Sequence, residues 1–378
     1  MNDGRSMRVL QLSKFYPPHL GGIETVARDL SAGLLARGAQ VEVLCANKKP
    51  QRSHEIDPAG VPVTRAASYG VLLSTSMAPG LPRLLRQRQG EFDIVHVHMP
   101  DPLAAVAIWW ARPHARVVLH WHSDVVRQRR SMALYAPLQN WLLSRADAVV
   151  ASSAAYADSS EPLRPWRRKV QVIPIGTAAP QAASSAQVAD TKARYGGRRI
   201  VFCLGRMTHY KGFEVLIEAC RHLPPDVVVV VAGGGDDWSP WRQRARAAGL
   251  GNQVLFVGPM TAAQVESHFS ASELFCLAST SRAEAYGVAV VEAMARGLPV
   301  VATKIPGSGL SWLHQDGVTG LAVPPGDPVA LAQAMNRLLA DGVLRRRCAA
   351  AARDRWLQHL QSDAMCDAMQ ALYRRLLG

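Results

Sequence analysis

Two glutamates stand eight positions apart in the stretch 281–301. Glu284 is followed by Ala285-Tyr286-Gly287, and Glu292 lies in an apolar run of Val, Ala and Met that predicts a buried helix. A buried carboxylate is costly unless something pairs with it, so we expect Glu292 to bind hydroxyls or phosphates of a ligand. The two carboxylates could also form an acid/base pair, as in glycoside hydrolysis. However, Glu284 lies in a turn before the helix, so the two side chains need not share a face.

Two cations follow a strand that the sequence predicts over residues 199–204. They stand in Gly205-Arg206 and in Lys211-Gly212. Arginine binds phosphate through a two-pronged fork, and lysine adds a point charge. Surface cations need no function, but a position at a strand end favours a phosphate site.

Two glycine-rich turns also adjoin predicted elements. Gly21-Gly22 precedes a helix predicted over residues 23–37, where glycine lets the backbone approach a ligand and the helix N-terminus favours an anion. Gly233–Gly235 follows a strand predicted over residues 227–232, and it suits close approach to a base or ribose. Gly-Gly by itself is more often a plain turn, and a plain turn explains Gly233–Gly235 as well as a ligand site does.

Four histidines follow one another at the ends of two strands in the first half of the chain: His96, His98, His120 and His122. By side-chain alternation we expect two of them on each face of a strand. No Cys, His or carboxylate spacing matches a standard zinc site, so we predict no metal. We expect His122 to bind sugar or phosphate oxygens and His96 and His120 to lie in the core.

Strands and helices alternate along most of the chain, with an Ala-, Ser- and Gln-rich stretch between two such series. Short strands rich in Val and Ile between helices are typical of parallel sheets covered on both faces. We therefore predict an α/β protein of two doubly wound domains, 1–176 and 193–359, joined by a linker at 177–192. Ligands of such sheets bind beyond the carboxyl ends of the strands, so we expect the site in a cleft between the domains.

Composition narrows the class of protein. The 378 residues carry a net charge of +14 and a pI near 10, which suits nucleic acid, an anionic membrane surface or phosphorylated substrates. No apolar run is long enough to cross a bilayer or resembles a signal peptide, which leads us to expect a cytoplasmic protein. The six cysteines are scattered through apolar runs and predict buried, reduced thiols.

The motifs, in their order and spacing over nearly the whole chain, resemble those of the retaining nucleotide-sugar glycosyltransferases of glycosyltransferase family 4, which have the GT-B fold. The matching motifs are Gly-Gly-Ile-Glu at 21–24, Trp-His-Ser-Asp at 121–124, Gly-Arg and Lys-Gly at 205–212, Ala-Gly-Gly-Gly at 232–235, the glutamate pair at 284 and 292, and Gly-x-Pro-Val-Val-Ala-Thr at 297–303.

The resemblance implies a role for each matching residue. It assigns catalysis to His122, Arg206, Lys211 and Glu284. It assigns donor binding to Gly21, Gly22, Gly205, Gly234, Tyr286, Gly287, Val288 and Glu292, and acceptor binding to His98, Ser123, Asp124 and Arg127. It implies no metal and no cofactor, because the cations stabilise the leaving diphosphate. It also places residues from about 360 to 378 with the N-terminal domain.

The fuller sequences at 16–24 and 122–128 resemble bacterial mannosyl- and rhamnosyltransferases of O-antigen or exopolysaccharide synthesis. This implies a hexose donor such as GDP-mannose, a polyprenyl-diphosphate-linked glycan acceptor, and a peripheral position on the anionic inner face of the plasma membrane. A UDP-sugar or GDP-rhamnose donor and a GT-B epimerase remain alternatives. A basic nucleic-acid-binding protein is a more distant one, because no binding module or basic aromatic stripe is present.

Overall fold

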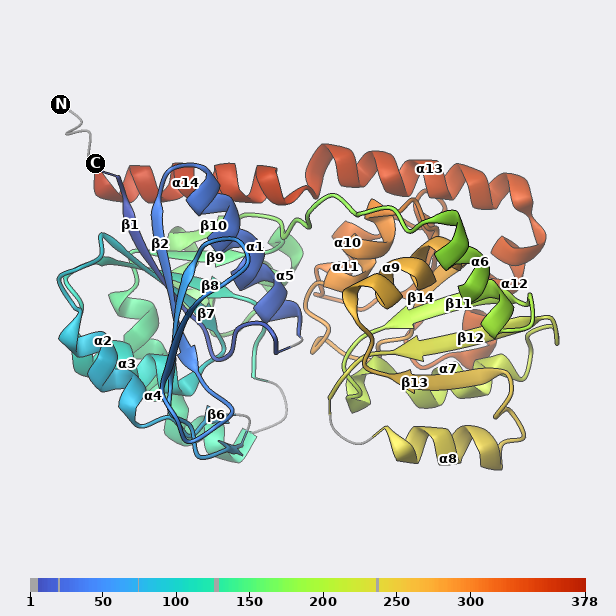
Figure 1. Cartoon of the computed structure of the whole chain (residues 1–378), viewed down its shortest axis with the longest axis horizontal. Coiled ribbons are helices and arrows are strands. Elements are labelled where there is room, and N and C mark those ends of the chain that lie inside the picture. The colour runs from blue at the N-terminus through green and yellow to red at the C-terminus, as the bar shows by residue number, and fades with distance from the viewer. Residues whose placement is uncertain (1–5, 20, 74, 126–128, 236–237) are drawn as a thin grey trace. The chain divides into compact units, whose positions relative to one another are not determined.

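The chain forms two compact units, each built on one large parallel sheet (Figure 1). The computed structural model describes residues 6–19, 21–73, 75–125, 129–235 and 238–378. The first unit extends to Gly176 and also includes the C-terminal segment Ser362–Gly378. The second unit is Thr177–Gln361. The two doubly wound α/β domains expected from the alternating pattern and the GT-B resemblance are therefore confirmed.

The sheet of the first unit has eight strands in the order β10-β9-β8-β7-β1-β2-β4-β3. Only β3 runs antiparallel to its neighbour. The strands are β1 Arg8–Leu12, β2 Gln40–Ala46, β3 Ser53–Ile56, β4 Pro62–Ala66, β7 Ile94–Met99, β8 Arg116–Trp121, β9 Ala148–Ala151 and β10 Val170–Val172. β5 Val71–Leu72 and β6 Thr75–Ser76 form a separate antiparallel hairpin.

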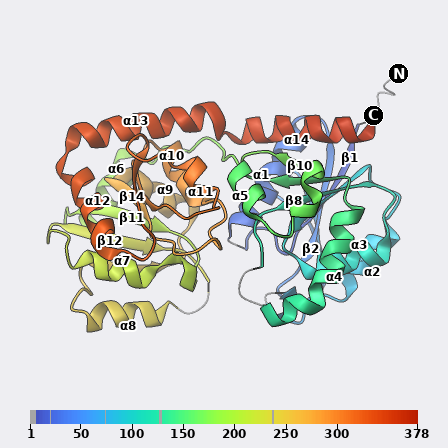
Figure 2. The same cartoon turned by 180° about the vertical axis from the view of Figure 1, so that it is seen from behind.

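Helices cover this sheet on both faces. The strand order reverses at β1, so the crossovers that leave β1 and β7 lie on opposite faces. Helix α14 packs beside α1 on one face, and α2, α3 and α4 form a row on the other (Figure 2). The helices are α1 Gly22–Ala36, α2 Gly80–Gln87, α3 Pro102–Ala111, α4 Arg129–Arg145, α5 Ala154–Ser159 and α14 Ser362–Leu377, with a short 3-10 helix at Arg164–Lys169.

The second unit has a six-stranded parallel sheet in the order β13-β12-β11-β14-β15-β16. The strands are β11 Arg199–Leu204, β12 Val227–Ala232, β13 Val254–Gly258, β14 Leu274–Leu277, β15 Val300–Thr303 and β16 Gly320–Val323. The helices are α6 Ser185–Arg194, α7 Phe213–Cys220, α8 Ser239–Ala247, α9 Ala262–Ala271, α10 Val288–Ala295, α11 Leu310–Leu313, α12 Pro328–Ala340 and α13 Gly342–His359, with a 3-10 turn at His209–Lys211. Every residue of β12 is buried, as expected for a central strand covered on both faces.

The segment for which we expected a linker, 177–192, belongs to the second unit and carries most of helix α6. The Ser184 hydroxyl accepts a hydrogen bond from the amide of Gln187, and the side-chain oxygen of Gln187 accepts one from the amide of Ser184. This capping box starts the helix despite its weak apolar periodicity. The helix packs against α9, which the composition of the segment alone did not indicate.

The last helix, α14, is held to α1 by packing and by charge. A Cβ added at Gly33 would lie 2.3 Å from Cys366 Sγ, so the two helices approach closely there. Arg37, at the end of α1, pairs with Asp363 at 2.9 Å and Asp367 at 2.6 Å. All six cysteines are buried and unpaired, as expected.

Between the first sheet and α14 lies a buried layer of polar side chains. It consists of Gln11 on β1, His96 and His98 on β7, His120 at the end of β8, and His122 just beyond it, with Tyr373 from α14 above them. Our expectation of two histidines on each face was wrong, because residues two apart share a face and His98 stands opposite His120 in the parallel register. Burial lowers the pKa of His120 to about 3, and burial with the neighbouring imidazoles lowers the pKa of His96, His98 and His122 well below 6.5.

Among the described residues, no helix has both the length and the apolar character needed to cross a membrane.

We predict that Gly33→Ala loosens α14 from α1. The new methyl group meets Cys366 Sγ, and overpacking of this kind typically costs about 1–3 kcal/mol. Hydrogen exchange in peptides covering 362–377 should rise. The double variant Gly33→Ala/Cys366→Ala should recover part of the protection, and equal exchange in the single variant and the wild type would show that the contact carries no packing energy.

We also predict that acid destabilises the first unit more strongly than the second, where burial lowers the pKa of His268 and His314 in the same way. The folded-state pKa values of the four histidines lie below their unfolded values, so the unfolded chain takes up protons as the pH falls through about 6.5 and the folded chain does not. Each histidine then removes up to about 1.4 kcal/mol per pH unit from the unfolding free energy.

Hydrogen exchange at pH 7.5, 6.5 and 5.5, corrected for intrinsic rates, measures this effect on peptides covering 94–122. Peptides covering 227–232 in the second unit serve as the internal control. Equal pH dependence in both sets would contradict the prediction.

Candidate functional site

In the second unit, the loops that follow neighbouring strands bring several predicted site residues together. Strand β11 lies between β12 and β14, and the loops at the carboxyl ends of these three strands carry Arg206 and Lys211, Gly233–Gly235, and Glu284. Parallel strands end at the same edge of a sheet, so these loops meet there. Residues separated by more than seventy positions become direct neighbours at this edge.

Lys211 and Glu284 form a buried ion pair. Lys211 Nζ lies 2.6 Å from Glu284 Oε2, and the Ser279 hydroxyl donates to the same oxygen at 2.7 Å. Lys211 is 9% exposed, Glu284 6% and Ser279 0%. Sequence reasoning gave Lys211 and Glu284 separate partners and did not anticipate their contact.

The pair keeps Lys211 charged. Burial alone disfavours the ammonium, but the nearby Glu284 carboxylate outweighs it and raises the pKa of Lys211, while the charge of Arg206 acts in the opposite sense. Arg206 is exposed directly after β11. The edge of the second sheet therefore presents one solvent-exposed cation close to one buried cation.

Two glycines make this arrangement possible. A Cβ at Gly205 would come within 3.0 Å of Lys211 Cε, and a Cβ at Gly212 would lie 2.1 Å from the Ala278 carbonyl oxygen. Gly212 also has φ of +68°, which disfavours residues with a Cβ. In the neighbouring loop, the Gly234 carbonyl accepts the Met207 amide at 3.0 Å and so joins the β11 and β12 loops.

Helix α10 starts at this edge as well. Gly287 is its N-cap in the left-handed region, and the amides of Val290 and Val291 donate to the Gly287 carbonyl. The amides of Val288 and Ala289 have no backbone acceptor among the described residues. A helix start of this kind favours an anion.

Glu292 does not lie as the sequence suggested, and the side chain of Tyr286 points into the core. Glu292 is half-buried on the same side of α10 as Val288 and Ala289, and the apolar residues on the opposite side form the core. Our expectation of a carboxylate within the buried face was wrong, because positions three and four apart share one helix face. Tyr286 is buried and its ring stacks at 6.5 Å against Trp312, so the ring belongs to the core of the second unit.

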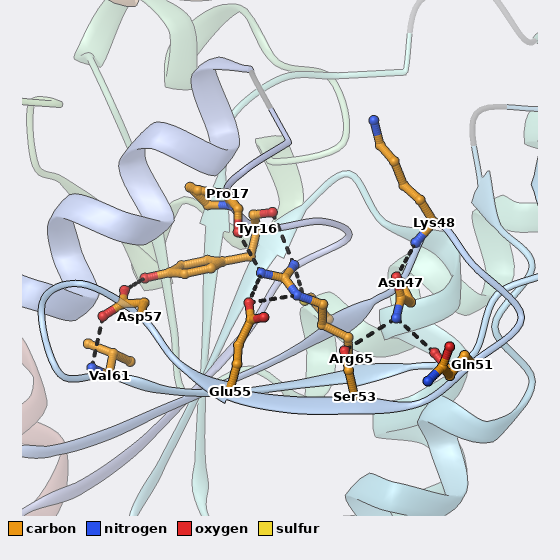
Figure 3. Close-up of polar contacts among 11 residues, drawn as sticks. Tyr16, Pro17, Asn47, Lys48, Gln51, Ser53, Glu55, Asp57, Val61 and Arg65 are labelled. Carbon is orange, nitrogen blue, oxygen red and sulfur yellow. Dashed lines mark hydrogen bonds and ion pairs between the residues drawn. The ribbon is translucent and has the colours of Figure 1, made fainter. Parts of the chain in front are cut away.

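In the first unit, the loop between β1 and α1 leads to Gly21 and Gly22, and side chains from neighbouring segments hydrogen-bond to it (Figure 3). The buried guanidinium of Arg65 donates to the carbonyls of Tyr16 and Pro17 and pairs with Glu55 at 2.6 Å. The Tyr16 hydroxyl donates to Asp57 at 2.7 Å.

Sequence reasoning missed Arg65. The only signal for it was a charged residue inside an apolar strand, where burial requires a partner. Gly22 is the first residue of α1, and the amides of Gly22 and Ile23 have no backbone acceptor among the described residues.

Two of the predicted acceptor residues, Ser123 and Asp124, follow the end of β8, directly after His122. His122 is 7% exposed, and its ring stacks on His120 at 4.1 Å. Contrary to our expectation, His98 is not presented to an acceptor, because His122 and Gln11 occupy both of its ring nitrogens. Asp124 accepts hydrogen bonds from Trp121 and Ser160, so its carboxylate braces the loop. Ser123 is half-buried, and Arg127 lies outside the described residues.

The histidine layer also has metal-like spacing. His96, His98 and His120 each offer a ring nitrogen, and these atoms lie within 4.8 Å of one another. The same rings already hydrogen-bond one another and their polar neighbours: His96 to His120 and Tyr373, and His98 to His122 and Gln11. Hydrogen bonds among its own side chains therefore join the members of the layer.

Several arginines and lysines that stand in basic runs of the sequence, at 83–88, 164–169 and 345–347, serve the fold. Arg88 pairs with Glu42 and Glu91, Lys169 donates to three carbonyls at the end of α4, and Arg345 pairs with Glu273. Basic clusters in the sequence therefore do not by themselves mark a binding surface.

Comparison with known proteins gives the family. Residues 187–355 match the family model for glycosyl transferases group 1, and residues 21–176 match that for a glycosyl transferase 4-like domain. The chain is 34% identical to O-antigen chain mannosyltransferase C of Escherichia coli over 98% of this chain and 99% of the relative. It is 31% identical to D-rhamnosyltransferase WbpZ of Pseudomonas aeruginosa, over 98% and 92%.

Solved structures share the fold. Sucrose-phosphate synthase from Thermosynechococcus elongatus matches with a TM-score of 0.81 and 23% identity over 98% of this chain and 99% of that one. Anabaena HepE in complex with UDP-glucose matches with a TM-score of 0.80 and 21% identity over 98% and 100%. The two family models together cover most of the chain, and its relatives match it over nearly their full length. This chain therefore belongs to the glycosyltransferases, with a 4-like first domain and a group 1 second domain.

Proposed function

We propose that this enzyme transfers a hexose, with mannose from GDP-mannose as the first candidate, from a nucleotide-sugar donor to a lipid-linked glycan in cell-surface polysaccharide synthesis. The observation that carries the proposal is the Lys211–Glu284 pair beside the exposed Arg206. Full-length similarity to an O-antigen mannosyltransferase and to a rhamnosyltransferase supports the substrate class.

The donor diphosphate takes the place that the cations and the α10 N-terminus favour. A lysine ammonium has three N–H donors, so Lys211 can keep its bond to Glu284 and still donate to a phosphate. Arg206 adds a fork-shaped donor from the solvent side. The half-buried Glu292 carboxylate is assigned to the ribose hydroxyls, and Glu284 to the hexose.

These groups stabilise the charge that develops on the leaving nucleotide diphosphate. The anomeric carbon loses its bond to the phosphate oxygen and gains a bond to the acceptor oxygen on the same face, and the acceptor proton passes to the leaving phosphate. Configuration is then retained. Because Arg206 and Lys211 supply the positive charge, transfer should persist in the presence of a chelator.

We predict that Lys211→Ala and Arg206→Ala each lower transfer about 10²–10³-fold, the typical loss when one preorganised charge contact is removed. Activity is measured with GDP-, UDP-, ADP- and dTDP-sugars, and binding by the thermal shift with each nucleotide, since a ligand that binds only the folded state raises its melting temperature. GDP should give the largest shift with the wild type.

The two variants separate binding from folding. Lys211→Ala leaves a buried carboxylate without its cation and should lower stability, whereas Arg206 is exposed and its removal should not. Lys192→Ala, an exposed lysine on α6, is the matched control. Wild-type transfer by Arg206→Ala and Lys211→Ala would refute the diphosphate site.

A peripheral position at the cytoplasmic face of the membrane is the second part of the proposal. The β5–β6 hairpin exposes Tyr69, Val71, Leu72 and Leu73 at 71%, 57%, 61% and 62%. Exposed apolar residues gathered in one short segment are unusual on a free surface. The exposed Lys48, Lys49 and Arg52 lie in the adjacent loop, whose Lys49 carbonyl accepts the Ser68 amide at the base of the hairpin. Apolar side chains beside cations suit an anionic lipid surface.

We predict that Leu72→Ser/Leu73→Ser weakens sedimentation with phosphatidylglycerol vesicles by several-fold, because each leucine contributes buried apolar area in the lipid interface. Vesicles of phosphatidylcholine alone should bind poorly. Ile56→Ser, at an equally exposed apolar residue outside the hairpin, is the matched control. Equal sedimentation of the hairpin variant and this control would exclude the hairpin as the membrane contact.

A further inference from the structure

A continuous hydrogen-bonded chain crosses the first sheet from Gln11 to His122. Gln11 Oε1 lies 3.0 Å from His98 Nε2, and His98 Nδ1 lies 2.9 Å from His122 Nε2. The three side chains are 0%, 1% and 7% exposed and come from β1, from β7 and from the residue that follows β8. The chain ends at the carboxyl edge of the sheet, where ligands of parallel sheets bind.

The chemistry of these groups sets the direction of the chain. An amide oxygen only accepts, so His98 Nε2 must carry the proton and donate to Gln11. A neutral imidazole has one N–H, so His98 Nδ1 is left as an acceptor. His122 Nε2 must then donate to it, and the remaining nitrogen of His122, Nδ1, is left with a free lone pair.

Burial keeps both rings neutral, and the direction of the hydrogen bonds depends on that neutrality. Desolvation and the adjacent imidazoles lower the pKa of His98 and of His122 well below 6.5. The titratable rings that pack against them are His96 and His120, and the Tyr373 hydroxyl bonds to His96; none of these groups is a carboxylate. His122 Nδ1 has no hydrogen-bond partner among the described residues.

We propose that Gln11 and His98 are positioning residues that hold His122 in the Nε2–H tautomer, so that its Nδ1 accepts a hydrogen bond from a substrate hydroxyl. This assignment rests on the proposed function in one respect, the placement of His122 at the sugar. The opposite tautomer would present a donor to the same hydroxyl. A second ring pair in the layer, His96 and His120, ends on Tyr373 and, although it packs against the chain, is not joined to it by a hydrogen bond between the described residues.

The tautomer can be read without any substrate, by long-range proton–nitrogen NMR of the full-length protein labelled with ¹⁵N-histidine. The wild type should show a protonated Nε2 and a bare Nδ1 at His122. Gln11→Leu removes the acceptor and should convert His122 to a mixture of tautomers, whereas Gln11→Glu, whose carboxylate only accepts, should restore the wild-type form. A protonated Nδ1 in the wild type, or an unchanged tautomer in Gln11→Leu, would overturn the proposal.

Steady-state kinetics test whether the hydrogen-bonded chain from Gln11 to His122 contributes to hexose transfer. In Gln11→Leu we expect kcat to fall by between about 10-fold and 10⁴-fold, the upper value being the loss when a catalytic histidine is held in the wrong tautomer. The donor KM should change little, and Gln11→Glu should recover most of kcat. Tyr373→Phe is the matched control, because it removes a hydroxyl that bonds to His96 in the same buried layer and takes part in neither hydrogen bond of the chain.

The two levels of failure can be distinguished. A tautomer that responds to Gln11 as predicted, with kcat unchanged, supports the chain and refutes the role assigned to His122 under the proposed function. A fall in kcat for Tyr373→Phe equal to that for Gln11→Leu would show that the layer acts only by packing, and would overturn the positioning role.

Discussion

The buried ion pair between Lys211 and Glu284 is the contact on which the candidate site depends. Removing two charges from water costs several kcal/mol per ion, and close geometry with a further hydrogen bond must offset that cost. Here the distance is 2.6 Å and Ser279 supplies the additional donor. Arg206, the α10 N-terminus and the glycine turns are arranged around this pair, and a loop shift of about an ångström would leave either charge buried and unpaired.

Close backbone approach makes the pair possible. Gly205 leaves room for the Lys211 side chain, and Gly212 lets the turn pass against the Ala278 carbonyl. Because β11 and β14 are hydrogen-bonded neighbours, the loops that follow them start side by side. The pair therefore ties two loops of distant sequence together, and it holds a cation in an environment that would otherwise favour its neutral form.

The first unit differs from the second in that it buries a layer of polar side chains against its sheet. Its layer of histidines is neutral and internally hydrogen-bonded, so burial costs less than it would for charged groups. Arg65 plays a comparable part beneath the loop that leads to Gly22, where two carbonyls and Glu55 satisfy its guanidinium. In both places a polar residue on a strand positions the loop at the carboxyl edge.

The sequence by itself determined the architecture, the family and the loops at the strand ends that carry the candidate site residues. Alternating short apolar strands and amphipathic helices follow from local periodicity, and glycine and cation motifs after strand ends mark the loops. The capped helix α6, hidden in an alanine-rich stretch, escaped because its start depends on a side-chain hydrogen bond rather than on apolar spacing.

Only the tertiary structure decided which side chains touch. The pairing of Lys211 with Glu284, the burial of His98 between Gln11 and His122, the half-exposed face that carries Glu292 and the bracing role of Asp124 all depend on strand order and register. Neighbouring strands in a parallel sheet are joined through crossovers, so contacts between them link residues far apart in the chain. Local sequence patterns cannot predict those contacts, because the contacts form only when the strands assemble into the sheet.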